Sequence, residues 1–582
     1  MSAGRSPAGP DGSVLLAWVI PGAAALAALA ATFLWMAEAV DALRTDRPWP
    51  AGPLEVGRAV ALEGAPLPSV LALAVAAVLV AVSVTLLVLV VARLTRGLRH
   101  RPDVDRSTRH LAKAPERQRL GHRARTAEAT RLAPSLKNAP GLLIGRTVNG
   151  GQRVYQGWED VALDVWGPRR GKTTSRAVPA LLAAPGAAVA TSNKRDLLDT
   201  TAGLRSQTGR VWVFDPQGIA SDGTPTFVYD PLSRVRTAVQ AQRLAALFVA
   251  DTKEPGARTD PQWDTAGADL LAWLMLAAAV DGRPLGDVWA WVSDSSDDTP
   301  VRLLREHGHE GPAASVDGVA HQPDKMRGSV YGTAQRMARP LINPQLLAWV
   351  TPTPGLPTFD PTAFVGSNGV NGSNGPRDTL YALSREGAGS SGAVVTALTS
   401  AICEDAERAA MTNPDRSGRL PTPLVVVLDE AANVCRWPEL PALYSHYGSR
   451  GIALLTFLQS YSQGVAVWGE EGMRTLWSAA TVRVYGGGVA DQRWLAELSD
   501  LIGDHDEIHR SVSTSRHGRS TSIDTRQRRT MTTAELTALP TKRAVVLAGG
   551  RPLLVEPMRW FEDKRQAETI TAAAKEWEAT HA

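Results

Sequence analysis

Two long uncharged apolar runs lie near the start of the chain, at 14–36 and 70–91. At 1.5 Å per residue, a helix of either length crosses a hydrocarbon core of about 30 Å. A cleaved signal peptide has a shorter apolar stretch and a more basic start than the first run. A soluble core helix keeps a polar face, which the second run lacks. We therefore predict a membrane anchor over residues 1–100 with two transmembrane helices.

The charges that flank the second run predict its orientation. Residues 93–125 carry eleven arginines and lysines against three acids, whereas 41–66 carries three arginines against four acids. Positive residues mark the cytoplasmic side. We expect a multi-pass protein of the plasma membrane with both termini and the C-terminal bulk in the cytoplasm. The basic segment 101–140 is predicted to be a cytoplasmic linker, which either touches anionic lipids or is a solvated flank.

From residue 141 short apolar runs alternate with helical patterns, which is typical of an α/β domain with a mainly parallel sheet. The last two strands flank a Gly-Gly-Arg turn and indicate a hairpin. The predicted strands are 161–166, 187–191, 210–214, 424–428, 452–458, 482–485, 544–548 and 552–555.

The strand pattern disappears between residues 236 and 354, where 266–280 and 327–339 have helical patterns. Pro340 is expected to end the second of these helices. The sequence therefore predicts an all-α domain inserted into the α/β domain. The α/β parts are 141–235 and 355–561, with a C-terminal helix at 562–582. The segment 366–375, rich in Gly, Asn and Ser, is predicted to be a surface loop or hinge.

Composition adds only broad limits. The 582 residues are 44% hydrophobic and 21% charged, which indicates several globular domains and little disorder. A net charge of +4 says little about partners. Cys403 and Cys435 form neither a metal-binding spacing nor a disulfide framework, which fits a reducing compartment.

A glycine-rich segment follows the predicted strand 161–166 and precedes a helical pattern. Amides of such a loop and the following helix N-terminus form an anion nest. Gly171 allows the backbone to approach a phosphate, Lys172 contacts the β- and γ-phosphates, and the Thr173 hydroxyl ligates Mg²⁺. We expect ATP to be bound by Gly167, Arg169, Arg170, Gly171, Lys172, Thr173 and Thr174.

This loop departs from the pattern G-x-x-x-x-G-K-[ST] in its first half. The first glycine is expected where Trp166 stands, and Gly167 comes one position late. Pro168 also removes one amide donor. The departure concerns the first half of the loop and leaves the Gly-Lys-Thr half intact.

Two further strands end in residues suited to phosphate chemistry. Asp429 and Glu430 follow the apolar strand 424–428, where Asp429 would hold Mg²⁺ and Glu430 would orient or deprotonate the attacking water. The alternative is a buried strand followed by a polar helix cap, but both motifs in this order favour a nucleotide site. Gln459 follows strand 452–458 and can sense the γ-phosphate, while Ser460 beside it is also a helix-cap candidate.

At this point the sequence resembles the type IV coupling proteins of bacterial conjugation and type IV secretion, the TraG/TraD-like ATPases. The resemblance runs from the apolar segments to about residue 560. It rests on the order of the stretches 167–175, 190–198 (ATSNKRDLL), 211–216 (VWVFDP), 229–232 (YDPL), 380–389 (LYALSREGAG), 425–430 and 451–463 (GIALLTFLQSYSQ).

The resemblance implies a RecA-like nucleotide-binding domain with an inserted all-α domain, and a homo-hexameric ring below the membrane. It implies an ATPase that recruits DNA, a relaxase–DNA complex or an effector protein to the membrane proteins of a secretion channel. Alternatives are a septal DNA translocase, which usually has four membrane spans and a winged helix, and a docking receptor with little ATP turnover. The Asp429–Glu430 pair argues against the receptor.

Arg450 is the candidate for an arginine donated to a neighbouring subunit's phosphates. It precedes the strand 452–458, so a parallel sheet puts it at the opposite end from Gln459. The alternative is a structural arginine that bonds a carbonyl or a surface acid. Arg169 and Arg170, already in the loop, are other candidates.

Two other features carry weaker signals. His505 and His509 have a spacing that binds zinc on a helix, but the acid of the H-E-x-x-H motif is misplaced, so we interpret them as surface residues. The basic, hydroxyl-rich segment 510–529 is predicted to be a loop that either lines a DNA channel or is solvated and mobile.

Overall fold

The computed structural model describes residues 12–97, 102–133, 136–253, 260–366, 377–387, 390–413, 417–515 and 518–581. Within these ranges, side chains are described except at 12–27, 87, 90–97, 509–515 and 518–522. The hinge or loop predicted at 366–375 lies almost wholly outside the described residues. The chain forms two compact units, Met1–Arg101 and Pro102–Ala582.

The first unit consists of helices α1 (Gly12–Thr45), α2 (Pro53–Leu62) and α3 (Val70–Gly97). Both apolar runs of the sequence are therefore helical. Three small residues, Ala37, Ala72 and Ala76, are buried where α1 and α3 pack together. The start of α3 is held by Asp41, which accepts hydrogen bonds of 2.6 and 2.5 Å from the backbone and hydroxyl of Ser69.

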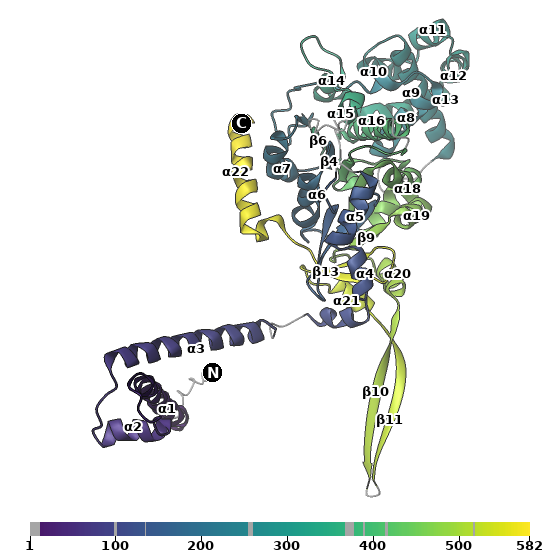
Figure 1. The fold of residues 1–582 in the computed structure, drawn as a ribbon. Coiled ribbons are helices and arrows are strands. Elements are labelled where there is room, and N and C mark those ends of the chain that lie inside the picture. The colour runs from purple at the N-terminus through teal and green to yellow at the C-terminus, as the bar shows by residue number, and fades with distance from the viewer. Residues whose placement is uncertain are drawn as a thin grey trace, which may run out of the picture. The chain divides into compact units, whose positions relative to one another are not determined.

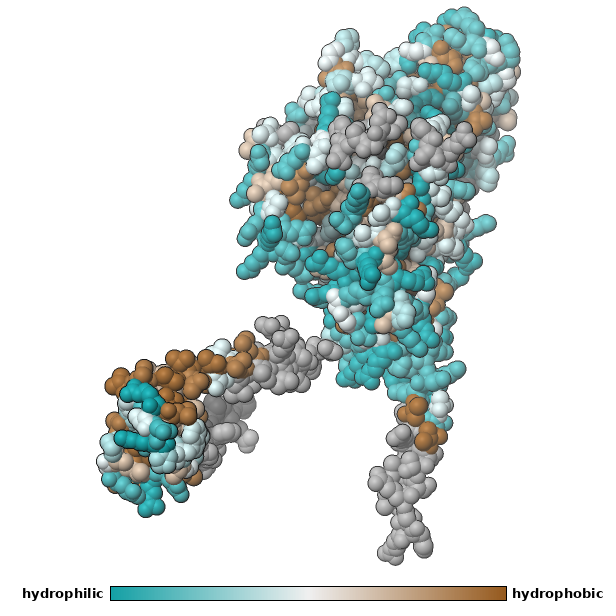
Figure 2. All heavy atoms as spheres, in the orientation of Figure 1, coloured by the Kyte–Doolittle hydropathy of each residue, from teal (hydrophilic) through white to brown (hydrophobic). Residues whose placement is uncertain are grey.

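The helices of this unit leave much of their apolar surface uncovered (Figure 2). Large exposed side chains of α3 are Val70, Leu71, Val75, Val78, Leu79, Val82, Val84 and Leu86. Among the residues whose side chains the structure describes, one helix has the length and composition to cross a membrane, and that is α9 (Pro261–Val280). Half of its apolar window is buried in the second unit, where it is a core helix, and within α3 the described side chains form the shorter apolar stretch Val70–Leu86.

The second unit is built on an eleven-stranded mixed sheet with the order β2-β1-β13-β12-β9-β3-β8-β7-β4-β6-β5. From β9 to β5 the pairs are parallel, and from β2 to β9 they are antiparallel. The strands are β1 (Leu142–Thr147), β2 (Arg153–Gln156), β3 (Ala162–Val165), β4 (Ala188–Ser192), β5 (Val211–Phe214), β6 (Thr379–Leu383), β7 (Leu424–Leu428), β8 (Ile452–Leu458), β9 (Val482–Tyr485), β12 (Ala544–Leu547) and β13 (Leu553–Glu556).

The α/β fold expected from the sequence is confirmed, and every predicted strand matches an observed one to within two residues. The strands β3, β4, β6, β7 and β8 are buried along their whole length because helices cover both faces of the parallel half. Such strands consist of continuous apolar runs, which is why the sequence pattern found most of them.

Helices pack around the sheet, and those that lie between β5 and β6 in sequence form a separate helical layer (Figure 1). The helices of this unit are α4 (Ala114–Arg119), α5 (His122–Leu132), α6 (Val178–Ala183), α7 (Asp196–Ser206), α8 (Ala238–Thr252), α9, α10 (Leu285–Ser293), α11 (Thr299–Glu306), α12 (Glu310–Ala320), α13 (Asp324–Ala338), α14 (Pro344–Val350), α15 (Pro361–Gly366), α16 (Gly392–Met411), α17 (Ala431–Val434), α18 (Leu440–Arg450), α19 (Tyr461–Ala479), α20 (Gln492–Ile502), α21 (Thr533–Thr537) and α22 (Lys564–His581). Short turns of helix are η1 (Asp103–Arg109), the π-helical η2 (Thr173–Ala177), η3 (Pro231–Arg234), η4 (Arg339–Ile342) and η5 (Trp560–Glu562).

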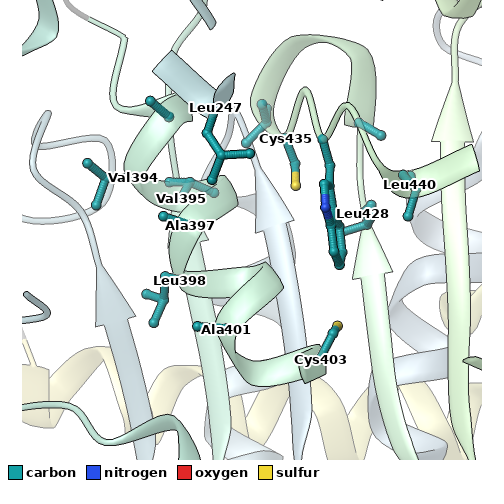
Figure 3. Close-up of a cluster of buried hydrophobic side chains, with 14 of the residues drawn as sticks. Leu247, Val394, Val395, Ala397, Leu398, Ala401, Cys403, Leu428, Cys435 and Leu440 are labelled. Atoms are coloured by element: carbon teal, nitrogen blue, oxygen red, sulfur yellow. The ribbon is translucent and has the colours of Figure 1, made fainter. Parts of the chain in front are cut away.

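One face of the parallel strands packs on α16, which is buried over most of its length. Apolar side chains of α16 meet Leu428 at the end of β7, Leu247 of α8 and Leu440 of α18 (Figure 3). Cys403 and Cys435 are buried in this cluster as free thiols. The cluster fixes the end of β7, the strand that precedes Asp429 and Glu430.

The segment predicted as a linker is folded onto the second unit. Asp105 accepts hydrogen bonds of 2.7 and 2.8 Å from Arg543, and the backbone of Ala112 bonds Pro552 O at 2.9 Å. The predicted C-terminal helix is present as α22 and packs on α7 (Figure 1).

A long two-stranded ribbon, β10 (Asp504–Ser515) and β11 (Gly518–Arg529), extends away from the sheet (Figure 1). The loop prediction for 510–529 was therefore wrong. His505 and His509 lie on β10, not on a helix, and His505 stacks on His110 with ring centroids 3.6 Å apart. Among the described residues no cluster of His, Cys, Asp or Glu suits a metal ion.

Candidate nucleotide-binding site

The candidate site lies at one edge of the parallel sheet. In the order β3-β8-β7-β4-β6 all neighbours are parallel, so the ends of these strands lie together. The segments that follow them carry Lys172, Gln459, the Asp429–Glu430 pair, Asn193 and Glu386. Crevices outside the carboxyl ends of parallel strands are the usual ligand sites of open α/β sheets.

Lys172 lies between the two carboxylates that follow β7. Its Nζ is 3.0 Å from Asp429 Oδ1 and 3.1 Å from Glu430 Oε1. The Thr173 hydroxyl donates to Asp429 Oδ2 at 3.4 Å. A cation, a hydroxyl and two carboxylates thus form one cluster, although the bonded partners are separated by 256 to 258 positions in the sequence.

The two carboxyl groups have different electrostatic environments. Burial raises the pKa of Asp429, against the opposing attraction of Lys172. Burial also acts to raise the pKa of Glu430, but Lys172 and hydrogen bonds from Lys172 and Gln459 outweigh it and hold that pKa below its usual value. Glu430 is therefore an anion at neutral pH. Its backbone is left-handed with φ of 55°, which turns the chain sharply after β7.

In the second half of the glycine-rich loop, the Gly171 carbonyl is bonded by the start of the following helix. Gly171 O accepts from the hydroxyls of Thr174 and Ser175 at 3.1 and 2.7 Å and from the Ser175 amide at 3.0 Å. Gly171 has φ of 92°, which a glycine adopts without strain. The Gly171 carbonyl is thus already occupied by donors of the protein, which suits an anion site at this loop.

The first half of the loop is tied to the segment after β9. The Gly167 amide donates to Gly487 O at 2.9 Å, and a methyl group on Gly167 would lie 2.0 Å from Gly488 O. Arg170 donates to Gly486 O at 3.2 Å and to Leu539 O. Trp166, which replaces the expected glycine, is fully buried. Gly167 and Arg170 thus hold the loop in place, whereas the exposed Arg169 is left-handed with φ of 57°.

Sequence reasoning missed a chain of polar side chains around Glu430. Asn193 Nδ2 donates to Glu430 Oε2 at 2.7 Å and to Glu386 Oε1 at 3.3 Å. Asn433 also donates to Glu386, and it accepts from Gln463 Nε2 at 2.8 Å. Asn193 and Glu386 belong to stretches that carry the family resemblance, but only the strand order brings them to Glu430.

Gln459 and Arg450 lie at opposite ends of β8. Gln459 follows the strand, and its backbone amide donates to Gln463 Oε1 at 3.0 Å. Arg450 ends α18, immediately before the strand, and donates to Gly418 O at 3.0 Å. Arg450 therefore lies at the expected end of β8, away from the cluster of its own subunit. It also bonds a backbone carbonyl, as expected if its role is structural.

Two family models match the chain. One, described as type IV secretory system conjugative DNA transfer, matches residues 125–353, and the other, described as the TraM recognition site of TraD and TraG, matches residues 423–541. Together they cover more than half of the chain, with Lys172 in one and Glu430 in the other. This chain belongs to the type IV coupling proteins. No curated protein sequence matches this coupling protein.

Solved structures share the fold of this coupling protein. The unbound monoclinic form of the bacterial conjugative coupling protein TrwBdeltaN70 matches with a TM-score of 0.51 at 18% identity, over 71% of this chain and 88% of that chain. Its trigonal form in complex with sulphate matches with 0.52 at 16%, over 74% and 92%. The plasmid coupling protein TrwB in complex with ADP and Mg²⁺ matches with 0.50 at 18%, over 71% and 89%.

Proposed function

We propose that this coupling protein is a membrane-anchored ATPase that drives DNA, carried as a relaxase–DNA complex, or an effector protein into a type IV secretion channel. The observation that carries the proposal is the convergence of Lys172, Thr173, Asp429 and Glu430 at one edge of the parallel sheet. The same function is supported by the match to the family model described as conjugative DNA transfer, and by the fold shared with TrwB in complex with ADP and Mg²⁺.

The residues of the cluster fit a nucleoside triphosphate with Mg²⁺. Hydroxyl and carboxylate oxygens are preferred Mg²⁺ ligands, and Thr173 Oγ1 and Asp429 Oδ2 are close enough to share one metal shell. When bound, Mg²⁺ neutralises charge on the β- and γ-phosphates. Lys172 would exchange its contacts with the two carboxylates for the phosphates, and the amides of Gly171 to Thr174 would line the nest.

Glu430 is the group that would position and activate water for attack on the γ-phosphate. Its lowered pKa keeps it ionised, and Asn193 fixes one of its oxygens at 2.7 Å. A held carboxylate can orient a water in line with the leaving group. Gln459, which follows β8, the strand between β3 and β7, would sense the γ-phosphate, and Gln463 and Asn433 extend that contact toward Glu386.

The first unit would anchor the protein through α1 and α3. Its support is the uncharged sequence of both runs and the exposed apolar side chains of α3, which are costly in water. The excess of arginine and lysine over residues 93–125 favours a cytoplasmic location for the second unit. Fractionation of the full chain tests the anchor: it should stay in the membrane pellet at high salt, and release by salt alone would contradict it.

A homo-hexameric ring would complete the site with Arg450 of a neighbouring subunit. An arginine at the γ-phosphate is worth about 10³-fold or more in rate. Arg450→Ala subunits mixed with Lys172→Ala subunits should regain turnover at interfaces that pair an intact Lys172 with a donated Arg450. Full activity of Arg450→Ala alone, or mixed rings that stay inactive, would contradict this role.

The function itself is tested by ATP turnover of the detergent-solubilised full chain with and without DNA. We expect Mg²⁺-dependent phosphate release that DNA stimulates and that Lys172→Ala abolishes. ATP binding without turnover under all conditions would instead support a docking receptor.

A further inference from the structure

We propose that the segment after β13 forms the nucleoside side of the site, with Arg559 contacting the α- or β-phosphate and Phe561 stacking on the base. This inference rests on the proposed nucleotide-binding function and adds residues that neither the motif nor the family match assigns. It concerns a nucleoside 5′-triphosphate or diphosphate as the ligand, without preference for one base.

Arg559 lies against the glycine-rich loop. A methyl group on Gly171 would be 3.4 Å from Arg559 Nε and 3.6 Å from its Nη2. The same position is 3.4 Å from Thr174 Oγ1, so Arg559 approaches the Gly171–Thr174 half of the loop. Helical turns η2 and η5, on either side of this contact, also pack together. Among the described residues Arg559 makes no ion pair, and a guanidinium so placed suits a phosphate oxygen.

The γ-phosphate side of the loop is already defined by other residues. Lys172 points toward Asp429 and Glu430, and the side chains of Gln459 and Asn193 bond Glu430. A phosphate chain held by Lys172 must leave the loop on another side. Arg559 lies beside Gly171 and, among the described residues, forms no ion pair with that cluster, so the nucleoside would extend past it.

Phe561 supplies an exposed ring next to Arg559. Its ring centroid is 5.9 Å from the Arg559 guanidinium carbon, and 45% of the residue is exposed. The half-buried Trp560 contacts it edge to face with centroids 5.5 Å apart, which holds the ring in place. Glu562 bonds Lys542 at 3.0 Å and ties the same turn to the segment after α21. A fixed, half-exposed ring is a ready surface for a nucleobase, and base–aromatic stacking tolerates any base.

The test compares ligands with and without a nucleoside. Affinities of the full chain in detergent would be measured by calorimetry for ATP, GTP and inorganic tripolyphosphate, each with Mg²⁺. Phe561→Ala should weaken ATP and GTP binding roughly tenfold and leave tripolyphosphate binding unchanged. Arg559→Ala should weaken all three about tenfold, because a charge-assisted hydrogen bond is lost.

Matched variants separate recognition from folding. Phe561→Tyr keeps a ring and should bind ATP like the wild type, Arg559→Lys should keep part of the affinity, and the exposed Arg565→Ala should have no effect. Unchanged ATP affinity in Phe561→Ala, or an equal loss for tripolyphosphate, would overturn the inference alone. A wild-type protein that binds neither ATP nor tripolyphosphate would overturn the proposed function, and this inference with it.

Discussion

The two halves of the glycine-rich loop contact different parts of the protein although they are consecutive in sequence. Residues 166–170 face the turn after β9, where Gly167 and Arg170 bond backbone carbonyls. Residues 171–174 face the carboxylates of β7, with Lys172 and Thr173 in contact with Asp429. The first half is held by contacts with the rest of the protein, so we propose that its glycine pattern is free to change.

The largest expected effect comes from restoring the usual glycine. Trp166→Gly removes a fully buried indole, which also fills the space beside Gly486. We expect the free energy of unfolding to fall by about 3–5 kcal/mol, as for other large-to-small core substitutions. Urea denaturation followed by circular dichroism measures this loss, and Trp166→Phe should show a smaller one. Wild-type stability with tighter ATP binding would mean that Trp166 merely occupies a glycine position.

Arg170→Ala should lower the free energy of unfolding by an intermediate amount, and it should affect stability more than ATP affinity. It removes the donor to Gly486 O and Leu539 O in a half-buried place, which costs about 1–3 kcal/mol of unfolding free energy. Arg170→Lys should not restore it fully, because a single ammonium cannot reproduce the planar fork. Denaturation and ATP titration of the same samples separate the two effects. A large loss of ATP affinity at unchanged stability would instead put Arg170 on the phosphates.

The smallest effect is expected at the exposed residue of the same half. Arg169→Gly relieves a left-handed backbone but adds freedom to the unfolded chain, so these terms nearly cancel and stability should change by less than about 0.5 kcal/mol. The same denaturation assay measures it. A loss as large as that of Arg170→Ala would show that Arg169 also anchors the loop.

The sequence predicted most of the strands that are buried on both sides. The strands β7 and β8 were predicted to the residue because each is a largely apolar run that ends at a polar residue, and β9 was predicted to the residue although it contains Arg483. The strands β1, β2 and β6 were not predicted. β1 contains Gly145 and an exposed Arg146, and β2 has only four residues. The ribbon of β10 and β11 lacks the apolar alternation of a packed strand, and it extends away from the sheet (Figure 1).

The site was predicted to the extent that it depends on local motifs. Lys172, Thr173, Asp429 and Glu430 each stand at a strand end with a recognisable spacing, and the structure brings them together. Asn193 and Glu386 carry no such spacing. Asn193 reaches Glu430, and Glu386 reaches Asn193, only because β4 lies between β7 and β6 in the sheet, and strand order is a property of the whole fold. The orientation of Arg170 depends likewise on the distant turn after β9.

The central claim is that Glu430 acts on water while Lys172 holds the nucleotide, and one comparison tests it directly. ATP affinity and phosphate release would be measured side by side for the wild type, Glu430→Gln and Lys172→Ala in detergent. We predict that Glu430→Gln keeps its ATP affinity and releases phosphate at least about 100-fold more slowly, since only a general base is lost. Lys172→Ala should lose affinity itself, roughly 100-fold, because a charge on the phosphates is removed. Normal phosphate release by Glu430→Gln would contradict the account.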